Sequence, residues 1–77
     1  MSVTIIGKED CQLCKAAVDL SVSKNIPFEY KKVNEDLTLD QAFELAGTPF
    51  RQFPAIIVEG KFIGGFNEYR RIAKDLV

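Results

Sequence analysis

Lys8-Glu9-Asp10-Cys11-Gln12-Leu13-Cys14 contains both cysteines of this chain, three residues apart. The stretch follows a short apolar run, Val3-Thr4-Ile5-Ile6, and leads into a segment whose apolar residues have helical spacing. Residues i and i+3 lie on the same face of a helix, so one sulfur can reach the other. The free N–H groups and the dipole at a helix N-terminus favour a thiolate there. We therefore predict Cys11 as the attacking thiolate and Cys14 as the resolving thiol.

The charges that precede Cys11 act in opposite directions on this thiolate. Lys8 adds to the positive field, whereas Glu9 and Asp10 oppose it. Asp10 stands directly before Cys11, and its side chain is of the type that caps helix N-termini. We predict Asp10 as the N-cap of the following helix.

Length and composition indicate one small soluble domain over residues 1–77. Hydrophobic residues make up 47% of the chain, which is normal for a globular domain. The formal net charge of −1 argues against a nucleic-acid partner, because phosphate contacts need a basic face. No apolar run is long enough to span a membrane or to form the core of a signal peptide. We expect a cytoplasmic monomer that binds neither nucleic acid nor membrane.

Two cysteines and no histidine restrict the possible chemistry. One Cys-x-x-Cys pair cannot by itself complete a four-ligand structural zinc site. A histidine base or a Cys–His nucleophile is excluded. Three interpretations remain: a redox pair, a metal or cluster site completed by another chain, and two incidental buried cysteines. A close pair in a reducing compartment favours the redox interpretation, with no metal site in the chain.

The remaining elements follow from local signals. Thr38-Leu39-Asp40-Gln41 matches a capping box, and Gly47 stands where a helix C-terminal glycine belongs. Pro54 precedes a β-branched run, and Glu59-Gly60 predicts a tight turn into a returning strand. Asn67 is the predicted N-cap of a last helix. We expect strands at 3–6, 28–33, 55–58 and 61–63, and helices at 11–24, at 39–46 and from 67 onward.

Apolar stripes support the three helices. The residues expected to face the core are Cys14, Ala17, Val18, Ser21 and Val22 in the first, Leu39, Ala42, Phe43 and Ala46 in the second, and Tyr69, Ile72, Ala73 and Leu76 in the third. The element order is β-α-β-α-β-β-α. The first β-α-β unit requires a parallel pair, and the hairpin adds two strands. We predict an α/β fold with a four-stranded mixed sheet flanked by three helices.

The chain resembles a glutaredoxin, a member of the thioredoxin superfamily. The residues that carry the resemblance are Val3–Lys8 ahead of Cys11-x-x-Cys14, then Phe53-Pro54, and then Gly64-Gly65-Phe66-Asn67. The resemblance implies a thioredoxin-like fold and thiol–disulfide oxidoreductase activity. It also implies a cis peptide bond between Phe53 and Pro54 that faces the cysteines and offers backbone groups to a bound peptide or glutathione.

The resemblance further implies a set of glutathione-binding positions. Lys8 matches the lysine that pairs with a glutathione carboxylate, and Phe53 would supply backbone hydrogen bonds to its cysteinyl part. Gly64, Gly65 and Asn67 match the loop that receives the γ-glutamyl end. The whole set of predicted binding residues is Lys8, Leu13, Gln52, Phe53, Pro54, Gly64, Gly65, Phe66 and Asn67.

Two positions depart from the glutaredoxin pattern. Gln12-Leu13 stands where the family usually has Pro-Tyr, and Asn67 stands where the Gly-Gly loop usually has aspartate. The stretch Phe50-Arg51-Gln52-Phe53-Pro54 looks like that of small glutaredoxin-like redoxins. Those proteins feed ribonucleotide reductase and accept electrons from thioredoxin reductase.

We therefore predict a dithiol–disulfide oxidoreductase that reduces protein disulfides or glutathione mixed disulfides, with ribonucleotide reductase as one possible acceptor. Glutathione is the expected reductant and co-substrate, and no tightly bound cofactor is needed. Two alternatives stay open. The protein is a redoxin reduced by thioredoxin reductase, or two copies bind an iron–sulfur cluster through Cys11 and glutathione.

Overall fold

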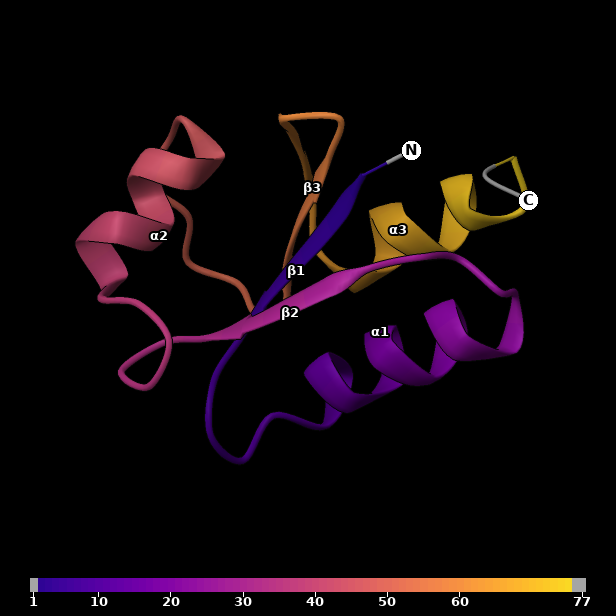
Figure 1. Ribbon diagram of the computed structural model, residues 1–77, viewed down its shortest axis with the longest axis horizontal. Helices are drawn as coiled ribbons and strands as arrows, with labels where there is room; N and C mark the ends of the chain where they lie inside the picture. The colour runs from indigo at the N-terminus through magenta and orange to yellow at the C-terminus, as the bar shows by residue number, and fades with distance from the viewer. Residues whose placement is uncertain (1, 76–77) are drawn as a thin grey trace.

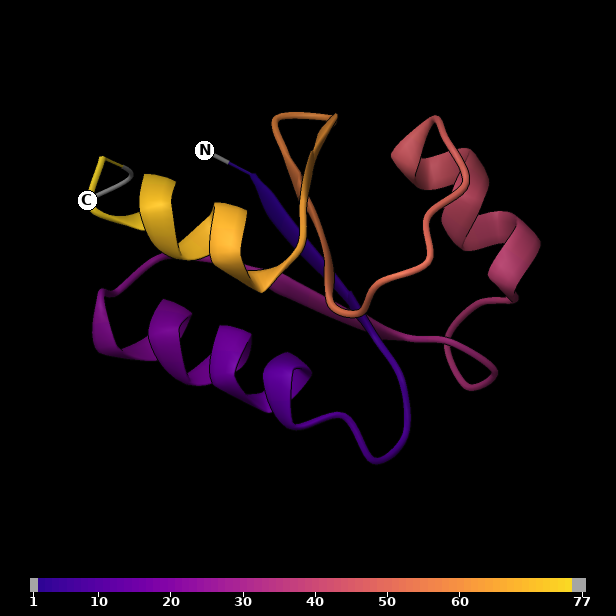
Figure 2. The same ribbon diagram turned by 180° about the vertical axis from the view of Figure 1, so that it is seen from behind.

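A computed structural model describes residues 2–75 of the chain, shown from opposite sides in Figures 1 and 2. Its elements run in the predicted order β-α-β-α-β-β-α. They are β1 (Val3–Gly7), α1 (Gln12–Ser23), β2 (Glu29–Lys32), α2 (Leu39–Ala46), β3 (Ala55–Val58), β4 (Lys61–Gly64) and α3 (Phe66–Ala73). No helix in this part of the chain is both long enough and apolar enough to cross a membrane. The predicted core position Leu76 lies outside the described residues.

The four strands form one mixed sheet in the order β2-β1-β3-β4, as predicted. β1 pairs in parallel with β2 and antiparallel with β3, and β3 pairs antiparallel with β4. In this register Ile6 lies opposite Ala55, and Ile56 lies opposite Gly64. The loop after β1, the loop before β3 and the loop after β4 therefore meet at one end of the sheet.

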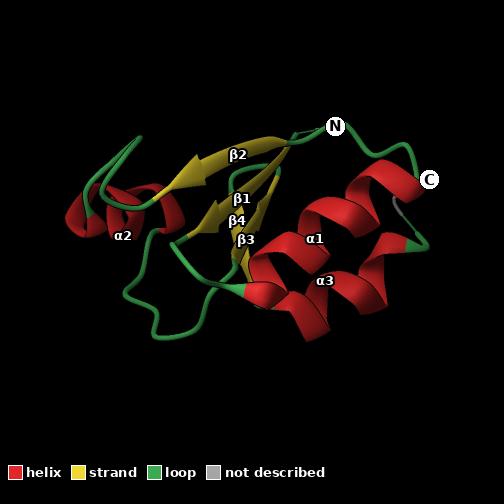
Figure 3. Ribbon diagram, turned by 90° about the horizontal axis from the view of Figure 1, so that it is seen from below, coloured by secondary structure: helices red, strands yellow, loops and turns green. Residues whose placement is uncertain are grey.

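Each face of the sheet carries its own apolar core, because successive strand side chains point to opposite faces. Helices α1 and α3 lie side by side on one face, and α2 lies on the other (Figure 3). The buried residues of the first core are Val3, Ile5, Ala17, Ile26, Ile56, Tyr69 and Ala73. Those of the second core are Ile6, Val33, Ala42, Ala46, Ala55 and Ile57.

The caps of α2 are confirmed, whereas those of α1 and α3 differ from the prediction. Thr38 and Gln41 form the expected capping box, and Gly47 is left-handed with φ +78°. Asp10 has φ +52° and does not cap α1, because an N-cap needs extended backbone. Cys11 holds that position instead, with φ −116°.

Helix α3 begins two residues earlier than an N-cap at Asn67 would allow. Gly65 is its N-cap, and Asn67 is the second residue of the helix. The cause is Glu68, whose carboxylate accepts the Gly65 N–H at 2.9 Å and fixes the first turn.

Two predicted core positions are exposed. Val22 in α1 is 63% exposed and Leu39 in α2 is 42% exposed, because each lies at the border of its apolar stripe. Strand β2 is shorter than predicted, because Phe28 instead packs against the first core and Val33 forms an isolated bridge with Leu37.

One buried hydrogen bond joins the two helices on the first face. The hydroxyls of Ser21 in α1 and Tyr69 in α3 are 2.5 Å apart, and both residues are fully buried. Ser21 Oγ donates its hydrogen to the Ala17 carbonyl at 2.9 Å. Tyr69 is therefore the donor to Ser21, and this bond ties the helix of the cysteines to the helix of the Gly-Gly loop.

We expect Ser21→Ala to lower the free energy of unfolding by about 1–3 kcal/mol, because the buried Tyr69 hydroxyl loses its acceptor. Adding Tyr69→Phe to Ser21→Ala should recover part of this loss, since no hydroxyl is then left unpaired. Urea unfolding measures both effects. Ser23→Ala is the matched control, because the Ser23 hydroxyl is exposed. If the changes in unfolding free energy of Ser21→Ala and Tyr69→Phe simply add, the two hydroxyls are not coupled.

Candidate active site

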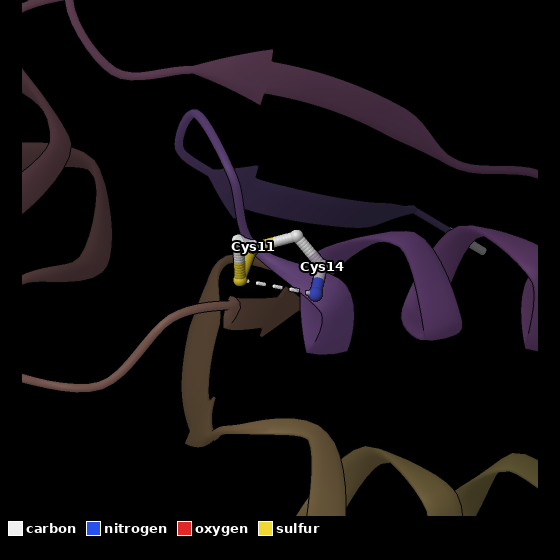
Figure 4. The surroundings of a disulfide bond; sticks show 2 residues. All are labelled: Cys11 and Cys14. Carbon is white, nitrogen blue, oxygen red and sulfur yellow. Dashed lines mark hydrogen bonds between the residues drawn. A yellow bond between two sulfur atoms is a disulfide. The ribbon is translucent and has the colours of Figure 1, made fainter.

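Cys11 and Cys14 form a disulfide with their Cα atoms 5.2 Å apart. Figure 4 shows the pair at the start of α1, where Cys11 is the N-cap and Cys14 lies in the first turn. The Cys14 N–H donates to Cys11 Sγ at 3.2 Å. A backbone N–H that donates to a sulfur favours its thiolate over its thiol. The expected proximity of the two sulfurs is confirmed.

The two cysteines differ in accessibility. Cys14 is only 1% exposed, whereas Cys11 is partly exposed. A target disulfide can therefore reach the sulfur of Cys11, while the sulfur of Cys14 is shielded. This asymmetry supports Cys11 as the nucleophile and Cys14 as the resolving thiol.

Lys8 belongs to the cysteine loop, residues 8–11 between β1 and α1. It contacts the proline loop, residues 50–54 before β3. Its ammonium stands over the ring of Phe53, 5.4 Å from the ring centroid. A cation at this distance from an aromatic face is attracted by the ring quadrupole. The contact holds the positive charge beside the residue that precedes Pro54, at the same end of the sheet as Cys11.

Glu9 belongs to an ion-pair group that sequence reasoning missed. Lys32, the last residue of β2, contacts the carboxylates of Glu9 and Glu35, the latter at 3.0 Å. These hydrogen bonds, that of Glu9 first, hold the pKa of Lys32 well above its usual range. Glu9 is paired in this way, so it opposes the Cys11 thiolate less than its place in the sequence suggests.

The Phe53–Pro54 peptide bond is cis, as the resemblance implied. Pro54 is buried, and Phe53 is partly exposed. The ring of Phe50 packs edge-on against Phe53 at 5.5 Å and against Phe43 of α2 at 4.9 Å, and it stacks on Phe62 of β4 at 5.8 Å. This aromatic cluster connects the proline loop to both α2 and β4.

The backbone of the Gly-Gly loop favours glycine at Gly64, and Gly65 packs closely against its neighbours. Gly64 has φ +127°, and a Cβ there would lie 2.7 Å from the Glu68 side chain. A Cβ on Gly65 would lie 3.3 Å from Gln52 Oε1 and 3.4 Å from the Pro54 carbonyl. The loop therefore packs directly against the residues around the cis proline.

Glu68 is the second site residue that sequence reasoning missed. Asn67 itself is neutral, but the next residue brings a carboxylate to the loop. The hydrogen bond from the Gly65 N–H is the main cause that holds the pKa of Glu68 below its usual range. An acid at the third position of a helix that follows glycine was the available signal.

Five of the predicted binding residues line one pocket of about 300 Å³, which we call the Leu13 pocket. They are Leu13, Gln52, Phe53, Phe66 and Asn67, and none of them is charged. Gly64 and Gly65 line an adjoining pocket together with Gln52. Pro54 is buried beneath Gly65, and Lys8 stands at Phe53. The structure thus gathers all the predicted positions at one end of the sheet, and their binding roles stay predictions.

Among residues 2–75 no three or more side chains of cysteine, aspartate or glutamate come together as a metal site would require.

Comparison with known proteins identifies the family. The sequence model of the glutaredoxin family matches residues 3–63. The chain belongs to the glutaredoxin family. Its members are thiol–disulfide oxidoreductases, and the Cys11–Cys14 pair gives this glutaredoxin the same chemistry.

Two curated relatives and one solved structure are similar to this glutaredoxin. Glutaredoxin 1 of Escherichia coli K12 is 28% identical over 97% of this chain and 95% of its own length. The glutaredoxin-like protein NrdH of Salmonella typhimurium is 35% identical over 86% of this chain and 79% of its own length. The structure of reduced Escherichia coli glutaredoxin superposes with a TM-score of 0.79 and 26% identity, covering 97% of this chain and 95% of the other.

We expect Lys8→Glu to raise the pKa of the Cys11 thiol, because a positive charge beside the site becomes negative. The rate of reaction with an anionic thiol compound should fall roughly fivefold at low salt, the factor that corresponds to about 1 kcal/mol for an exposed pair. High salt should reduce the effect by screening. The measurement is the pH dependence of Cys11 alkylation.

Lys61→Glu is the control for this prediction. It makes the same charge change in the β3–β4 hairpin, where Lys61 pairs with Val58 far from the cysteine loop. If neither Lys8→Glu nor Lys61→Glu changes the pH dependence of Cys11 alkylation, Lys8 does not act on the thiol.

Proposed function

We propose that this glutaredoxin reduces disulfides of protein targets by dithiol exchange, working in the reducing cytoplasm. The observation that carries the proposal is the Cys11–Cys14 disulfide at a helix N-terminus, with Cys11 accessible and Cys14 buried. The chemistry requires one attacking thiolate and one shielded thiol within bonding distance. Both are present.

The proposed cycle is balanced in electrons and protons. The Cys11 thiolate attacks one sulfur of the target disulfide, and the other target sulfur leaves as a thiolate that takes up a proton. Cys14 then loses its proton and attacks Cys11 in the mixed disulfide. The second target sulfur leaves as a thiolate and takes up the proton that Cys14 released, so the target departs with two thiols, two electrons richer, and the Cys11–Cys14 disulfide is formed again.

The reductant that restores the dithiol is the finer part of the proposal. We propose that glutathione does so with modest efficiency, and that thioredoxin reductase is the competing electron source. The Leu13 pocket supports glutathione as a reductant of modest efficiency. Its size suits a small thiol compound, but its lining offers no charge to the ionic ends of glutathione. Leu13 is 52% exposed, which suits contact with a protein.

The proposed class of target rests on the resemblance of the proline loop and on one relative. The proline loop Phe50–Pro54 resembles that of redoxins that serve ribonucleotide reductase, and one relative is named a glutaredoxin-like protein NrdH. We propose a protein disulfide of this kind, such as that of ribonucleotide reductase, as the acceptor.

The roles of the two thiols are tested by serine substitution. Cys11→Ser should abolish disulfide reduction, because the nucleophile is lost. Cys14→Ser should complete the first attack and accumulate a mixed disulfide between Cys11 and the target. Intact-mass spectrometry of each variant after mixing with a disulfide substrate detects the adduct. A stable adduct formed by Cys11→Ser and not by Cys14→Ser would reverse the assignment.

The choice of reductant is tested at Asn67. Asn67→Asp places a single charge in the Leu13 pocket, where it can pair with the ammonium of the γ-glutamyl group. A charge-assisted hydrogen bond of this kind adds about 1 kcal/mol, or roughly a fivefold gain in glutathione-dependent turnover. Reduction by thioredoxin reductase should stay nearly unchanged, since a protein docks over a wider surface.

The assays compare NADPH, glutathione and glutathione reductase with NADPH and thioredoxin reductase. Asn25→Asp is the matched control, because Asn25 lies just after the end of α1 opposite to Cys11. If Asn67→Asp changes neither activity, the Gly-Gly loop does not receive glutathione and the redoxin function takes precedence.

A further inference from the structure

A second pocket adjoins the Leu13 pocket, and Gln52 lines both. Its volume is about 410 Å³. Phe50, Phe62 and Ile63 supply its apolar lining, and we call it the Phe62 pocket. The exchange cycle uses none of these three residues, so the cycle alone gives no reason for an apolar pocket beside the site.

The apolar lining of the Phe62 pocket is preformed. Phe50 and Phe62 stack at 5.8 Å with an angle of 19° between the rings. Phe50 also packs on Phe53, the residue before the cis proline. The pocket is therefore built on the same aromatic cluster that holds the proline loop, and the two pockets keep a fixed position relative to each other.

The pocket also lies along a free strand edge. β4 is the last strand of the sheet and pairs only with β3 within the described residues. Phe62, Ile63 and Gly64 belong to this strand, and all three line the pocket. The outer edge of such a strand offers unpaired N–H and C=O groups to an extended polypeptide.

The charges of the Phe62 pocket argue against a small ion as its ligand. Arg51 and Glu68 both line it, and they have opposite signs. Glu68 already accepts the Gly65 N–H, so that backbone donor at the start of α3 is occupied. An apolar lining, a mixed pair of charges and a free strand edge together fit a polypeptide segment.

We propose that the Phe62 pocket binds a large apolar side chain of the disulfide target, located within a few residues of the target cysteine. The target backbone passes over Gln52, the residue that lines both pockets. The cysteine of the target then lies at Cys11. The Leu13 pocket covers the target residues between this cysteine and the apolar side chain. This inference rests on the proposed function and adds to it a sequence preference in the target.

The kinetic test uses the pre-reduced protein in single-turnover reactions, which need no reductase. The substrates are disulfide-linked eight-residue peptides with one cysteine, carrying phenylalanine two residues before it, phenylalanine two residues after it, or alanine at both places. One of the two phenylalanine peptides should react about tenfold faster than the alanine peptide, as expected for burial of a large apolar side chain. Bis(2-hydroxyethyl) disulfide serves as the small substrate.

Phe62→Ala should remove the preference for phenylalanine: its rates with the phenylalanine and alanine peptides, each divided by its own rate with the small disulfide, should become equal. Phe28→Ala is the matched control, because Phe28 packs against the core on the other face of the sheet. The preference should persist in that variant.

A second measurement does not depend on the folding of Phe62→Ala. Cys14→Ser is trapped as a mixed disulfide with the faster phenylalanine peptide and with the alanine peptide. Amide NMR signals of Ile63 and Gly64 should differ between the two adducts. Shifts confined to Leu13, Phe53 and Phe66 would overturn the inference.

Other outcomes also overturn the inference. Equal rates for the three peptides would do so while the reaction with the small disulfide upheld the proposed function. Failure to oxidise the protein with any disulfide would instead refute the proposed function itself. Signals of Ile63 and Gly64 that move with protein concentration would assign the pocket to a second copy of the chain, and signals that move with glutathione would assign it to a small thiol.

Discussion

The antiparallel pairing of β1 with β3 is the constraint on which the site depends. Because Ile6 lies opposite Ala55, the chain leaving β1 and the chain entering β3 meet at one end of the sheet. The cysteine loop and the cis-proline loop are thereby neighbours, although more than forty residues separate them in the sequence. β4 adds the Gly-Gly loop through its pairing with β3. The rest of the molecule holds these three loops at fixed positions.

Two fixed sets of contacts support the site from opposite sides. On one face, the Ser21–Tyr69 hydrogen bond joins α1 to α3, so the cysteines and the Gly-Gly loop move together. On the other face, Phe50 joins the proline loop to α2 and β4. Lys32 adds a third tie by pairing Glu9 of the cysteine loop with Glu35. A preorganised nucleophile loses little conformational freedom when a target binds.

Local sequence signals predicted the element order, the α2 capping box and the Cys11–Cys14 proximity, because each depends on residues only a few positions apart. The cis bond at Pro54 came from the family resemblance, since local sequence gives proline only a small cis preference. The predicted N-caps of α1 and α3, Asp10 and Asn67, were wrong. Asp10 adopts a left-handed conformation, and the N-cap Gly65 has no side chain to signal its role. The Lys32–Glu9 and Ser21–Tyr69 contacts span 23 and 48 residues, beyond any local pattern.

The position of Glu68 has a consequence for how the site distinguishes its partners. A carboxylate that accepts the Gly65 N–H occupies a helix N-terminal donor that would otherwise be free for an anionic ligand. The Leu13 pocket beside it has a neutral lining. Within the Leu13 pocket, shape and backbone groups therefore contribute more to recognition than charge does. Recognition of this kind suits an extended polypeptide more than a small ionic thiol, because each residue of a polypeptide brings its own hydrogen-bonding groups and apolar surface.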